Sequence, residues 1–277
     1  SSILHQGKEM SYNNIADTDT AIDCVCNFVE PTCVIVKHAN PCGVSSRKNI
    51  LDAYQSAFES DPTSAFGGII AFNEKVSDEV AKKLIGNQFL EVVAAPAYSD
   101  ESLKIFMAKP NVRVLSFEPK INDRNKILSV SGGLLIQSAD NKIIAEDDLE
   151  VVTKREPNKG EIQNALFAWK VCKYVKSNAI VFAANKQTLG IGAGQMSRID
   201  SGKIAASKAK EFEFSLNGAS MASDAFFPFR DNVDNAHELG IKCIIQPGGS
   251  IKDEEVIQAA NEADMSMLFT KVRHFRH

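Results

Sequence analysis

A lysine and a histidine stand side by side where an apolar run of this chain meets a turn. Residues 33–36 are Cys-Val-Ile-Val, too short and too apolar for anything but a buried strand, and they lead directly into Lys37 and His38. The next residues, 40–43, are Asn-Pro-Cys-Gly and predict a turn, because proline lacks an N–H and glycine tolerates positive φ. An ammonium and an imidazole at a strand end, where open α/β sheets bind ligands, can move protons on a substrate. The plainer alternative is a pair of solvated rim residues, and both side chains reach one substrate only if the strand twists or bulges there.

Three other stretches have the composition of ligand-binding loops. Residues 190–194, Gly-Ile-Gly-Ala-Gly, match neither the dinucleotide nor the P-loop spacing, so a turn between two strands is the better interpretation. Residues 218–231 hold three phenylalanines, a proline and an arginine, which is too apolar for an exposed loop; they either pack beneath it or line a pocket. The tail, residues 271–277, is rich in cations and is either a frayed end or an anion site.

The elements that would position these residues alternate between strand and helix. The predicted strands are residues 33–37, 69–72, 91–95, 112–117, 179–183, 242–246 and 265–269, and the predicted helices are residues 20–29, 50–58, 78–85, 101–108, 161–175, 201–212, 232–239 and 253–263. This alternation indicates βαβ units and a largely parallel sheet covered on both faces. The pattern weakens between residues 133 and 160, where we place a boundary between two lobes. In the helix that follows, Trp169 lies on the apolar stripe and is expected in the core.

Composition excludes several classes of protein. The 277 residues are 44% hydrophobic and 24% charged with a net charge of −4, so we expect a globular chain with no nucleic-acid partner. No apolar run approaches the roughly 20 residues that span a bilayer, so we expect no membrane partner and a cytoplasmic location. The six cysteines form no Cys-x-x-Cys pair and are expected to be free thiols. A zinc deaminase is excluded on its ligands, because the H-x-E and P-C-x-x-C signatures are both missing.

The motif at residues 37–43, Lys-His-Ala-Asn-Pro-Cys-Gly, carries a family resemblance. Together with matching segments elsewhere, it resembles the formyltransferase domain of the bifunctional AICAR transformylase/IMP cyclohydrolase family of purine biosynthesis, in its bacterial form. These segments follow the family's order along the chain and are residues 11–19, 61–68, 176–179, 190–198, 223–231, 246–250 and 273–277. Two parts of the family's pattern are absent from this sequence: the cyclohydrolase domain, and an Arg-Tyr-Gly-Glu-Asn-Pro-His-Gln type segment that opens the transferase domain.

The resemblance implies a fold and an assembly. The expected class is α/β, with two cytidine-deaminase-like three-layer α/β/α lobes without zinc, the first over residues 1–150 with the Lys-His site and the second over residues 151–277. The family further implies a homodimer whose sites lie between subunits. Because of the missing segments, we weigh a second hypothesis, a truncated and catalytically silent nucleotide-binding dimer.

The resemblance also implies a reaction and its catalytic residues. The formyl group of formyl-tetrahydrofolate, a folate co-substrate, passes to the amine of aminoimidazole carboxamide ribotide. His38 engages the carboxamide and accepts the proton, while Lys37 stabilises the oxyanion or protonates the leaving nitrogen. Asn178 is expected to donate its amide N–H to the formyl oxygen.

Further positions are implied to bind the substrate. Arg198 and Arg273 match positions that hold the nucleotide, and Phe226 matches an aromatic that packs against the substrate rings. Ser197 and Asp231 complete the expected substrate-binding set. A structural potassium ion near Ser177 and Asp224 is an optional part of the same expectation.

Overall fold

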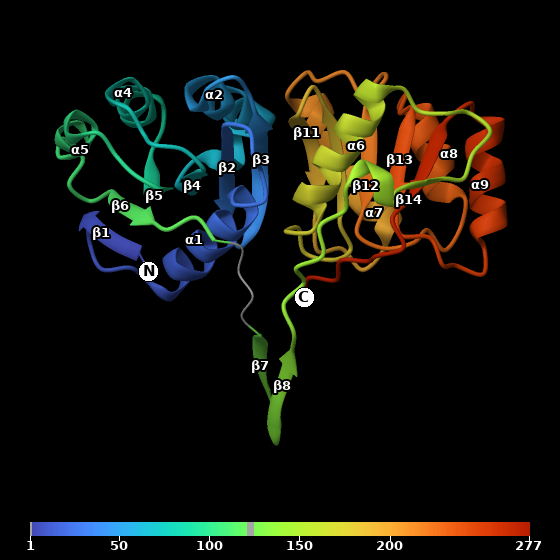
Figure 1. The fold of residues 1–277 in the computed structure, drawn as a ribbon, viewed down its shortest axis with the longest axis horizontal. Coiled ribbons are helices and arrows are strands. Elements are labelled where there is room, and N and C mark those ends of the chain that lie inside the picture. Colours follow the sequence, from blue (N-terminus) through green and yellow to red (C-terminus); the bar gives the residue numbers. More distant parts are fainter. Residues whose placement is uncertain (1, 121–124) are drawn as a thin grey trace.

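The computed structural model describes residues 2–120 and 125–277 of the chain. Within these residues, twelve strands form one sheet in the order β1-β6-β5-β4-β2-β3-β11-β10-β12-β13-β14-β9, and a separate hairpin, β7–β8, projects away from it (Figure 1). The strands are β1 (Ser2–Gln6), β2 (Thr32–Lys37), β3 (Asn40–Ser46), β4 (Gly68–Phe72), β5 (Leu90–Ala95), β6 (Arg113–Phe117), β7 (Lys126–Val130), β8 (Gly133–Gln137), β9 (Glu150–Val151), β10 (Ile180–Ala184), β11 (Gln187–Gly192), β12 (Ser220–Ser223), β13 (Cys243–Gln246) and β14 (Ser266–Phe269). The helices are α1 (Tyr12–Val25), α2 (Ile50–Ser60), α3 (Pro62–Ala65), α4 (Asp78–Asn87), α5 (Asp100–Phe106), α6 (Lys159–Cys172), α7 (Arg198–Glu211), α8 (Asp231–Glu238) and α9 (Asp253–Glu262), with a 3-10 turn, η1 (Glu146–Asp148).

The sheet has two halves, which meet where β3 pairs with β11. In the described sheet, β4, β5 and β6 run parallel in one half, and β12, β13 and β14 run parallel in the other. The central strands are antiparallel, because β2–β3 and β10–β11 are hairpins that return the chain at once in the opposite direction. The α/β class is confirmed, whereas the prediction of a largely parallel sheet is wrong at the centre.

Helices cover both faces of this sheet. Helices α1 and α6 lie over one face and share a single hydrophobic core that crosses both halves. The opposite face carries two cores, one under α2, α4 and α5 and one under α7, α8 and α9. Alternate residues of β2 point to opposite faces of the sheet, so Val34 and Val36 lie in the shared core. Cys33 and Ile35 lie in the core under α2, α4 and α5. Trp169 is 2% exposed and belongs to the shared core, as predicted.

The N-terminal part of the chain differs from the prediction. Helix α1 begins at Tyr12 rather than near residue 20, because Ser11 and Asn14 form a reciprocal capping box in which each side chain accepts from the other's backbone N–H. Residues 2–6, which show no clear element in the sequence, form β1 and pair with β6 at the edge of the sheet.

Glycines expected in turns lie instead within strands. The predicted turns at residues 40–43 and 190–194 are wrong, because these residues largely belong to β3 and β11. The reason is close packing of helices on the sheet: a Cβ on Gly43 would lie 2.0 Å from the Ala57 carbonyl oxygen, and one on Gly192 would lie 1.8 Å from that of Ser201. Glycine is therefore required for space at these positions rather than for positive φ.

The apolar stretch at residues 218–231 is only in part a loop. Residues 220–223 form β12 in the middle of the second half of the sheet. Phe227 packs into the core beneath the loop, whereas Phe226 and Phe229 are 38% and 58% exposed. The first alternative thus applies to Phe227, whereas the second, that phenylalanines of this stretch line a pocket, stays a prediction.

Candidate functional site

Lys37 and His38 stand at a tight hairpin turn between β2 and β3. Lys37 ends β2 and pairs with Asn40, so His38 and Ala39 form the turn, at φ of 52° and 57°. These left-handed angles match the right-handed twist of a two-residue hairpin but are unusual for side chains other than glycine. The register between β2 and β3 shifts at Val36, so the bulge expected beside the Lys-His pair is present.

A buried aspartate on α1 holds this turn. The two Asp17 carboxylate oxygens accept hydrogen bonds from the backbone N–H groups of His38 and Ala39, at 3.1 and 2.7 Å. Charged acceptors make stronger hydrogen bonds than neutral ones, which compensates for the unfavourable φ angles. The sequence analysis missed Asp17, because the two amides that it binds lie about 20 residues away and have no signature in the sequence.

The Lys37 ammonium is held by two hydrogen bonds to backbone carbonyl oxygens, which use two of its three hydrogens. It donates to the carbonyl oxygens of Phe66 and Gly67, at 2.9 and 3.0 Å, in the loop before β4. An ammonium has three hydrogens, so one remains for a substrate. The His38 side chain is exposed and its imidazole has no hydrogen-bond partner among the described residues. Both groups therefore keep free bonding capacity.

Residues 176–178, which belong to the second half of the molecule, contact this turn. The Asn40 side-chain oxygen accepts from the Lys176 backbone N–H at 2.8 Å, which ties the β2–β3 turn to residues 176–178. The Asn178 amide nitrogen donates to the carbonyl oxygens of Gln195 and Met196, at 2.9 and 3.2 Å. Its side-chain oxygen has no partner within the part of the chain that the structure describes. The Asn40–Lys176 hydrogen bond thus joins the turn that carries Lys37 and His38 to the segment that carries Asn178, and we call this region the junction of the two halves.

Arg198 and Asp224 form a buried cluster behind this junction. The Arg198 guanidinium donates to one Asp224 oxygen at 2.7 Å and to the Ser223 hydroxyl at 2.8 Å. The Ser177 hydroxyl donates to the other Asp224 oxygen. Asp224 is fully buried, and the Arg198 side chain is 9% exposed. The predicted contact between Arg198 and a nucleotide stays a prediction, since the described contacts of its guanidinium are internal.

The expected potassium ion can be judged against the same cluster. Both Asp224 oxygens already accept from protein donors, including the Ala179 backbone N–H at 3.2 Å, so the carboxylate is satisfied without a cation. Among residues 2–120 and 125–277, no group of three or more His, Cys, Asp or Glu side chains could hold a metal ion. The potassium ion stays a prediction, and no chemical step is derived through it.

The C-terminal tail packs against the site. His274 is 2% exposed, contacts Asp140 through Nδ1, and lies against Trp169 with ring centroids 4.7 Å apart. Burial by itself would raise the pKa of Asp140, but the hydrogen bond to His274 and its charge outweigh this effect and leave the pKa lower than usual. The Ser177 backbone N–H donates to the Arg276 carbonyl oxygen at 2.9 Å, and the Arg276 backbone N–H donates to the Ser177 hydroxyl at 3.2 Å. The frayed end, one of the two alternatives for the tail, is wrong.

The remaining predicted substrate-binding residues lie on the second half without a shared contact. Arg273 is exposed, with its guanidinium 4.9 Å from the centre of the Phe275 ring. Ser197 caps α7, where its hydroxyl accepts from the Asp200 N–H. Asp231 is exposed at the start of α8 and accepts from the Asn232 side chain. These roles, and that of Phe226, stay predictions.

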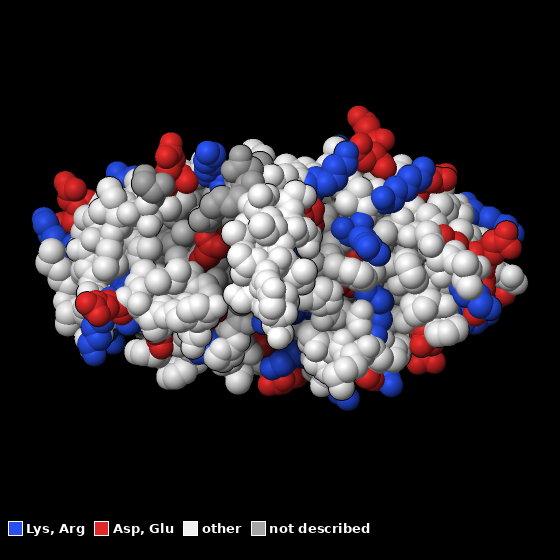
Figure 2. Space-filling model, turned by 90° about the horizontal axis from the view of Figure 1, so that it is seen from below, with Lys and Arg blue, Asp and Glu red and all other residues white. Residues whose placement is uncertain are grey.

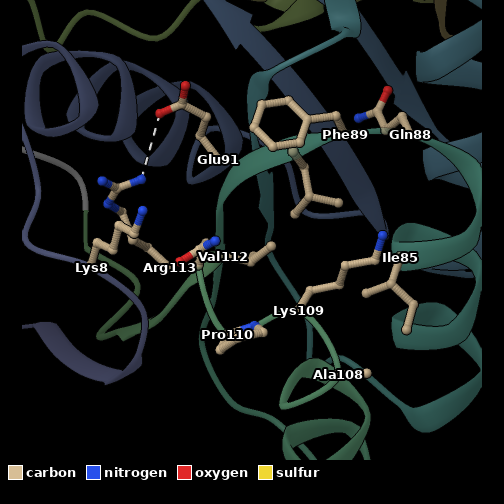
Figure 3. Close-up of a pocket in the computed structure, with 12 residues that line it drawn as sticks. Lys8, Ile85, Gln88, Phe89, Glu91, Ala108, Lys109, Pro110, Val112 and Arg113 are labelled. Carbon is tan, nitrogen blue, oxygen red and sulfur yellow. Dashed lines mark ion pairs between the residues drawn. The ribbon is translucent and has the colours of Figure 1, made fainter.

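A pocket of about 500 Å3 opens beside Lys37 in the first half of the molecule (Figure 3). It is connected to the lysine through Phe89, which lines the pocket, accepts from the Gly67 N–H at 2.8 Å and lies against the Phe66 ring. The lining residues come from the segment after β1, from the end of α4 and the residues after it, from the residues after α5, and from the starts of β5 and β6. They are Lys8, Ile85, Gln88, Phe89, Leu90, Glu91, Ala108, Lys109, Pro110, Asn111, Val112 and Arg113. No motif in the sequence pointed to this pocket.

Charged side chains surround a pocket whose lining is largely apolar. Lys8, Lys109 and Arg113 place three cations around it, and one carboxylate, Glu91, pairs with Arg113 at 3.5 Å (Figure 3). Both polar atoms of the Gln88 amide are buried and have no partner among the described residues. A buried unpaired amide costs free energy, so it favours a ligand that offers both a donor and an acceptor.

One comparison, with models of protein families, shows the family of this chain. A family model described as AICARFT/IMPCHase bienzyme matches residues 1–208. A solved structure of protein ybgI, described as of unknown function, is similar over 74% of this chain and 72% of its own, with 9% identity and a TM-score of 0.18. No described helix is long and apolar enough to cross a membrane.

Proposed function

Because the chain belongs to the AICARFT/IMPCHase bienzyme family of purine-biosynthesis enzymes, we propose that it transfers a formyl group from formyl-tetrahydrofolate to the amine of aminoimidazole carboxamide ribotide. The observation that carries this proposal is the junction of Lys37, His38 and Asn178, three side chains from both halves of the sheet with unused bonding capacity. Formyl transfer needs such groups, because the aromatic amine is a weak nucleophile and the oxygen of the tetrahedral intermediate carries charge.

Each group has a role in this scheme. The amine nitrogen attacks the formyl carbon, and the carbon–oxygen π electrons move to the oxygen, where the remaining Lys37 hydrogen stabilises the charge. His38 accepts the proton that the amine loses. The bond from carbon to the folate nitrogen then breaks, and that nitrogen receives a proton from the lysine or the imidazolium. The scheme therefore needs no metal.

The role of Asn178 differs from the one that the family resemblance implied. Its amide nitrogen already donates to two backbone carbonyls, so the atom left for a substrate is the oxygen. An oxygen accepts, and the amine of the ribotide offers N–H donors. We therefore assign Asn178 to orienting the amine rather than to binding the formyl oxygen.

The pocket beside Lys37 suits the ribotide. Its three cations can bind a phosphate, and the buried Gln88 amide can pair with a carboxamide through one donor and one acceptor. The exposed Phe226 and Phe229, in the second half of the molecule, offer apolar surface for the folate ring system. The arrangement thus supplies separate surfaces for the two substrates.

Formyl transfer by the purified chain tests this proposal, followed by absorbance with ribotide and formyl-tetrahydrofolate. Lys37→Ala is expected to lower turnover by about 10²–10⁴-fold, the usual size of a proton-transfer or oxyanion contribution. Lys104→Ala is the matched control, since that lysine is exposed on α5 and Glu101 is its one ion-pair partner among the residues that the structure describes.

Three results would contradict the proposal. Equal activity of the two variants would remove Lys37 from the reaction. Ring closure of formylated ribotide by the chain, without formyl transfer, would assign it the family's cyclohydrolase reaction instead. Tight binding of ribotide and folate without turnover would favour the silent nucleotide-binding dimer.

A further inference from the structure

Arg276, in the C-terminal tail, contacts both halves of the molecule. Its backbone pairs with Ser177 in the second half, where the Ser177 N–H donates to the Arg276 carbonyl oxygen at 2.9 Å and the Arg276 N–H donates to the Ser177 hydroxyl at 3.2 Å. Its side chain reaches the first half, where the guanidinium donates to the Thr20 hydroxyl on α1 at 2.7 Å. One residue therefore spans the two halves.

The segment that the Arg276 backbone holds leads directly into Asn178. Ser177 precedes Asn178 in the chain, and its hydroxyl donates to the Asp224 carboxylate. The Asp224 carbonyl oxygen in turn accepts from the His274 backbone N–H at 2.9 Å. Ser177 is thus hydrogen-bonded to the tail and to Asp224, which restricts the position of the Asn178 side chain.

The helix that the guanidinium contacts carries Asp17. Thr20 follows Asp17 by three residues, so the two side chains lie on the same face of α1. They are 3% and 7% exposed. Asp17 accepts from the backbone N–H groups of His38 and Ale39 in the turn after Lys37. Holding α1 against the tail therefore also holds the Lys-His turn against the tail.

A buried tyrosine supports the guanidinium. The guanidinium carbon of Arg276 lies 5.8 Å from the centre of the Tyr174 ring, and Tyr174 is 6% exposed. The Tyr174 hydroxyl accepts from the Asn27 side chain, just after α1, at 2.6 Å. A planar guanidinium can stack on a ring and donate to a hydroxyl at the same time, whereas an ammonium is a compact point charge. A lysine should therefore replace Arg276 only in part.

Other cations surround Arg276. Burial lowers the pKa of Lys126, and the charges of Arg276 and Lys176 lower it further. The chain ends on the lower side of the molecule in Figure 1, and Figure 2 shows this side from below, with Lys and Arg side chains gathered over the second half. Repulsion between like charges opposes this placement of Arg276, so its bonds to Ser177 and Thr20 and its contact with Tyr174 must outweigh the repulsion.

We propose that Arg276 is a positioning residue, which fixes Asn178 relative to Lys37 through its contacts with Ser177 and α1. This role rests on the proposed formyl transfer, in which Asn178 orients the amine while Lys37 stabilises the oxygen of the same tetrahedral intermediate. The two groups belong to different halves, and the Asn40–Lys176 hydrogen bond is a second connection between their segments. A displacement of about 1 Å between reacting groups can cost about 10²-fold in rate.

Steady-state kinetics of formyl transfer by the full chain test the role. Arg276→Ala is expected to lower kcat by about 10–100-fold while KM for formyl-tetrahydrofolate changes by less than about three-fold. Arg276→Lys should recover part of the loss. Lys271→Ala is the matched control in the same tail, because Lys271 is exposed and pairs with Glu150 on β9, and it should keep the wild-type kcat.

Two further comparisons separate positioning from a general structural role. In an Asn178→Ala background, Arg276→Ala should lower kcat by less than about two-fold, because the group through which it acts is already gone. Thr20→Val, which removes the acceptor on α1, should lower kcat in the same way as Arg276→Ala, whereas Thr20→Ser should keep it. A wild-type kcat in Arg276→Ala, or an equal loss with and without Asn178, would overturn the proposal.

Amide hydrogen exchange separates this proposal from the proposed function. The backbone N–H groups of His38, Ala39 and Ser177 should exchange at least about ten-fold faster in Arg276→Ala than in wild type, and at the wild-type rate in Lys271→Ala. A wild-type chain without formyl transfer would contradict the proposed function, and exchange would still decide the role of Arg276. Faster exchange at these amides would support it, and unchanged exchange would overturn it.

Discussion

The junction around Lys37 and the cluster around Asp224 both contain polar and charged side chains, but the two regions differ in how fully these side chains are hydrogen-bonded. At the junction, Lys37, His38 and Asn178 each keep an atom without a hydrogen-bond partner among residues 2–120 and 125–277. In the cluster, the Asp224 carboxylate is fully buried and both its oxygens are bonded to protein donors. Spare bonding capacity is what chemistry on a substrate requires, whereas a saturated buried pair fixes the position of its neighbours. On this criterion, the junction suits the proposed reaction and the Asp224 cluster suits a positioning role.

The largest effect that would test this comparison is the removal of the Asp224 carboxylate. Asp224→Ala leaves Arg198 as an uncompensated buried charge and is expected to cost about 3–5 kcal/mol of unfolding free energy. Asp234→Ala is the control, because Asp234 makes an exposed pair with Arg230 and its removal should cost about 0.5 kcal/mol or less. Urea unfolding measures both. Equal losses would mean that the Asp224 cluster does not stabilise the fold in the way we describe.

An intermediate effect is expected at Asp17, which positions the turn without touching the substrate. Asp17→Ala leaves the His38 and Ala39 amides without their acceptor, so it should cost about 1–3 kcal/mol of stability. Turnover should fall at least about ten-fold as Lys37 and His38 lose their geometry. Asp17→Asn keeps one acceptor oxygen and should restore part of both. If Asp17→Ala lowered stability but left turnover unchanged, the turn would be structural only.

The smallest effect concerns the tail, where a partly exposed carboxylate pairs with a buried histidine. The pKa of Asp140 is lower in the folded chain than in the unfolded one, where aspartate titrates near ~3.9. Its contribution is therefore present above that value and is lost as the pH falls through the lower, folded value. Asp140→Asn should cost under about 1 kcal/mol at neutral pH.

The difference between Asp140→Asn and wild type should shrink as the solution is acidified below the pKa of the unfolded carboxyl. Urea unfolding at neutral and acidic pH measures it. A loss that stayed the same across this range would show that the charge of Asp140 is not what stabilises the tail.

Local patterns in the sequence predicted most of the elements, because helix and strand periods and caps depend on neighbouring residues. The stripe that carries Trp169 and the apolar run before Lys37 are examples, and the Lys-His pair was found because it interrupts such a run. The glycines of β11 were misread for the same reason. Glycine is needed there because the backbone of α7 packs closely against β11. This contact joins segments that are not neighbours in the sequence, so a local pattern cannot predict it.

The sequence by itself determined the α/β class, the buried strand that ends at Lys37, and the motif at residues 37–43 that indicates the family. Only the tertiary structure decided which groups face one another: Asp17 beneath the turn, Asn178 beside it, Arg198 closed onto Asp224, and the pocket behind Phe89. It also decided that β7 and β8 form a hairpin separate from the large sheet. The physical reason is that residue periodicity acts within one element, whereas strand pairing, burial and saturation of polar groups arise between segments far apart in the chain.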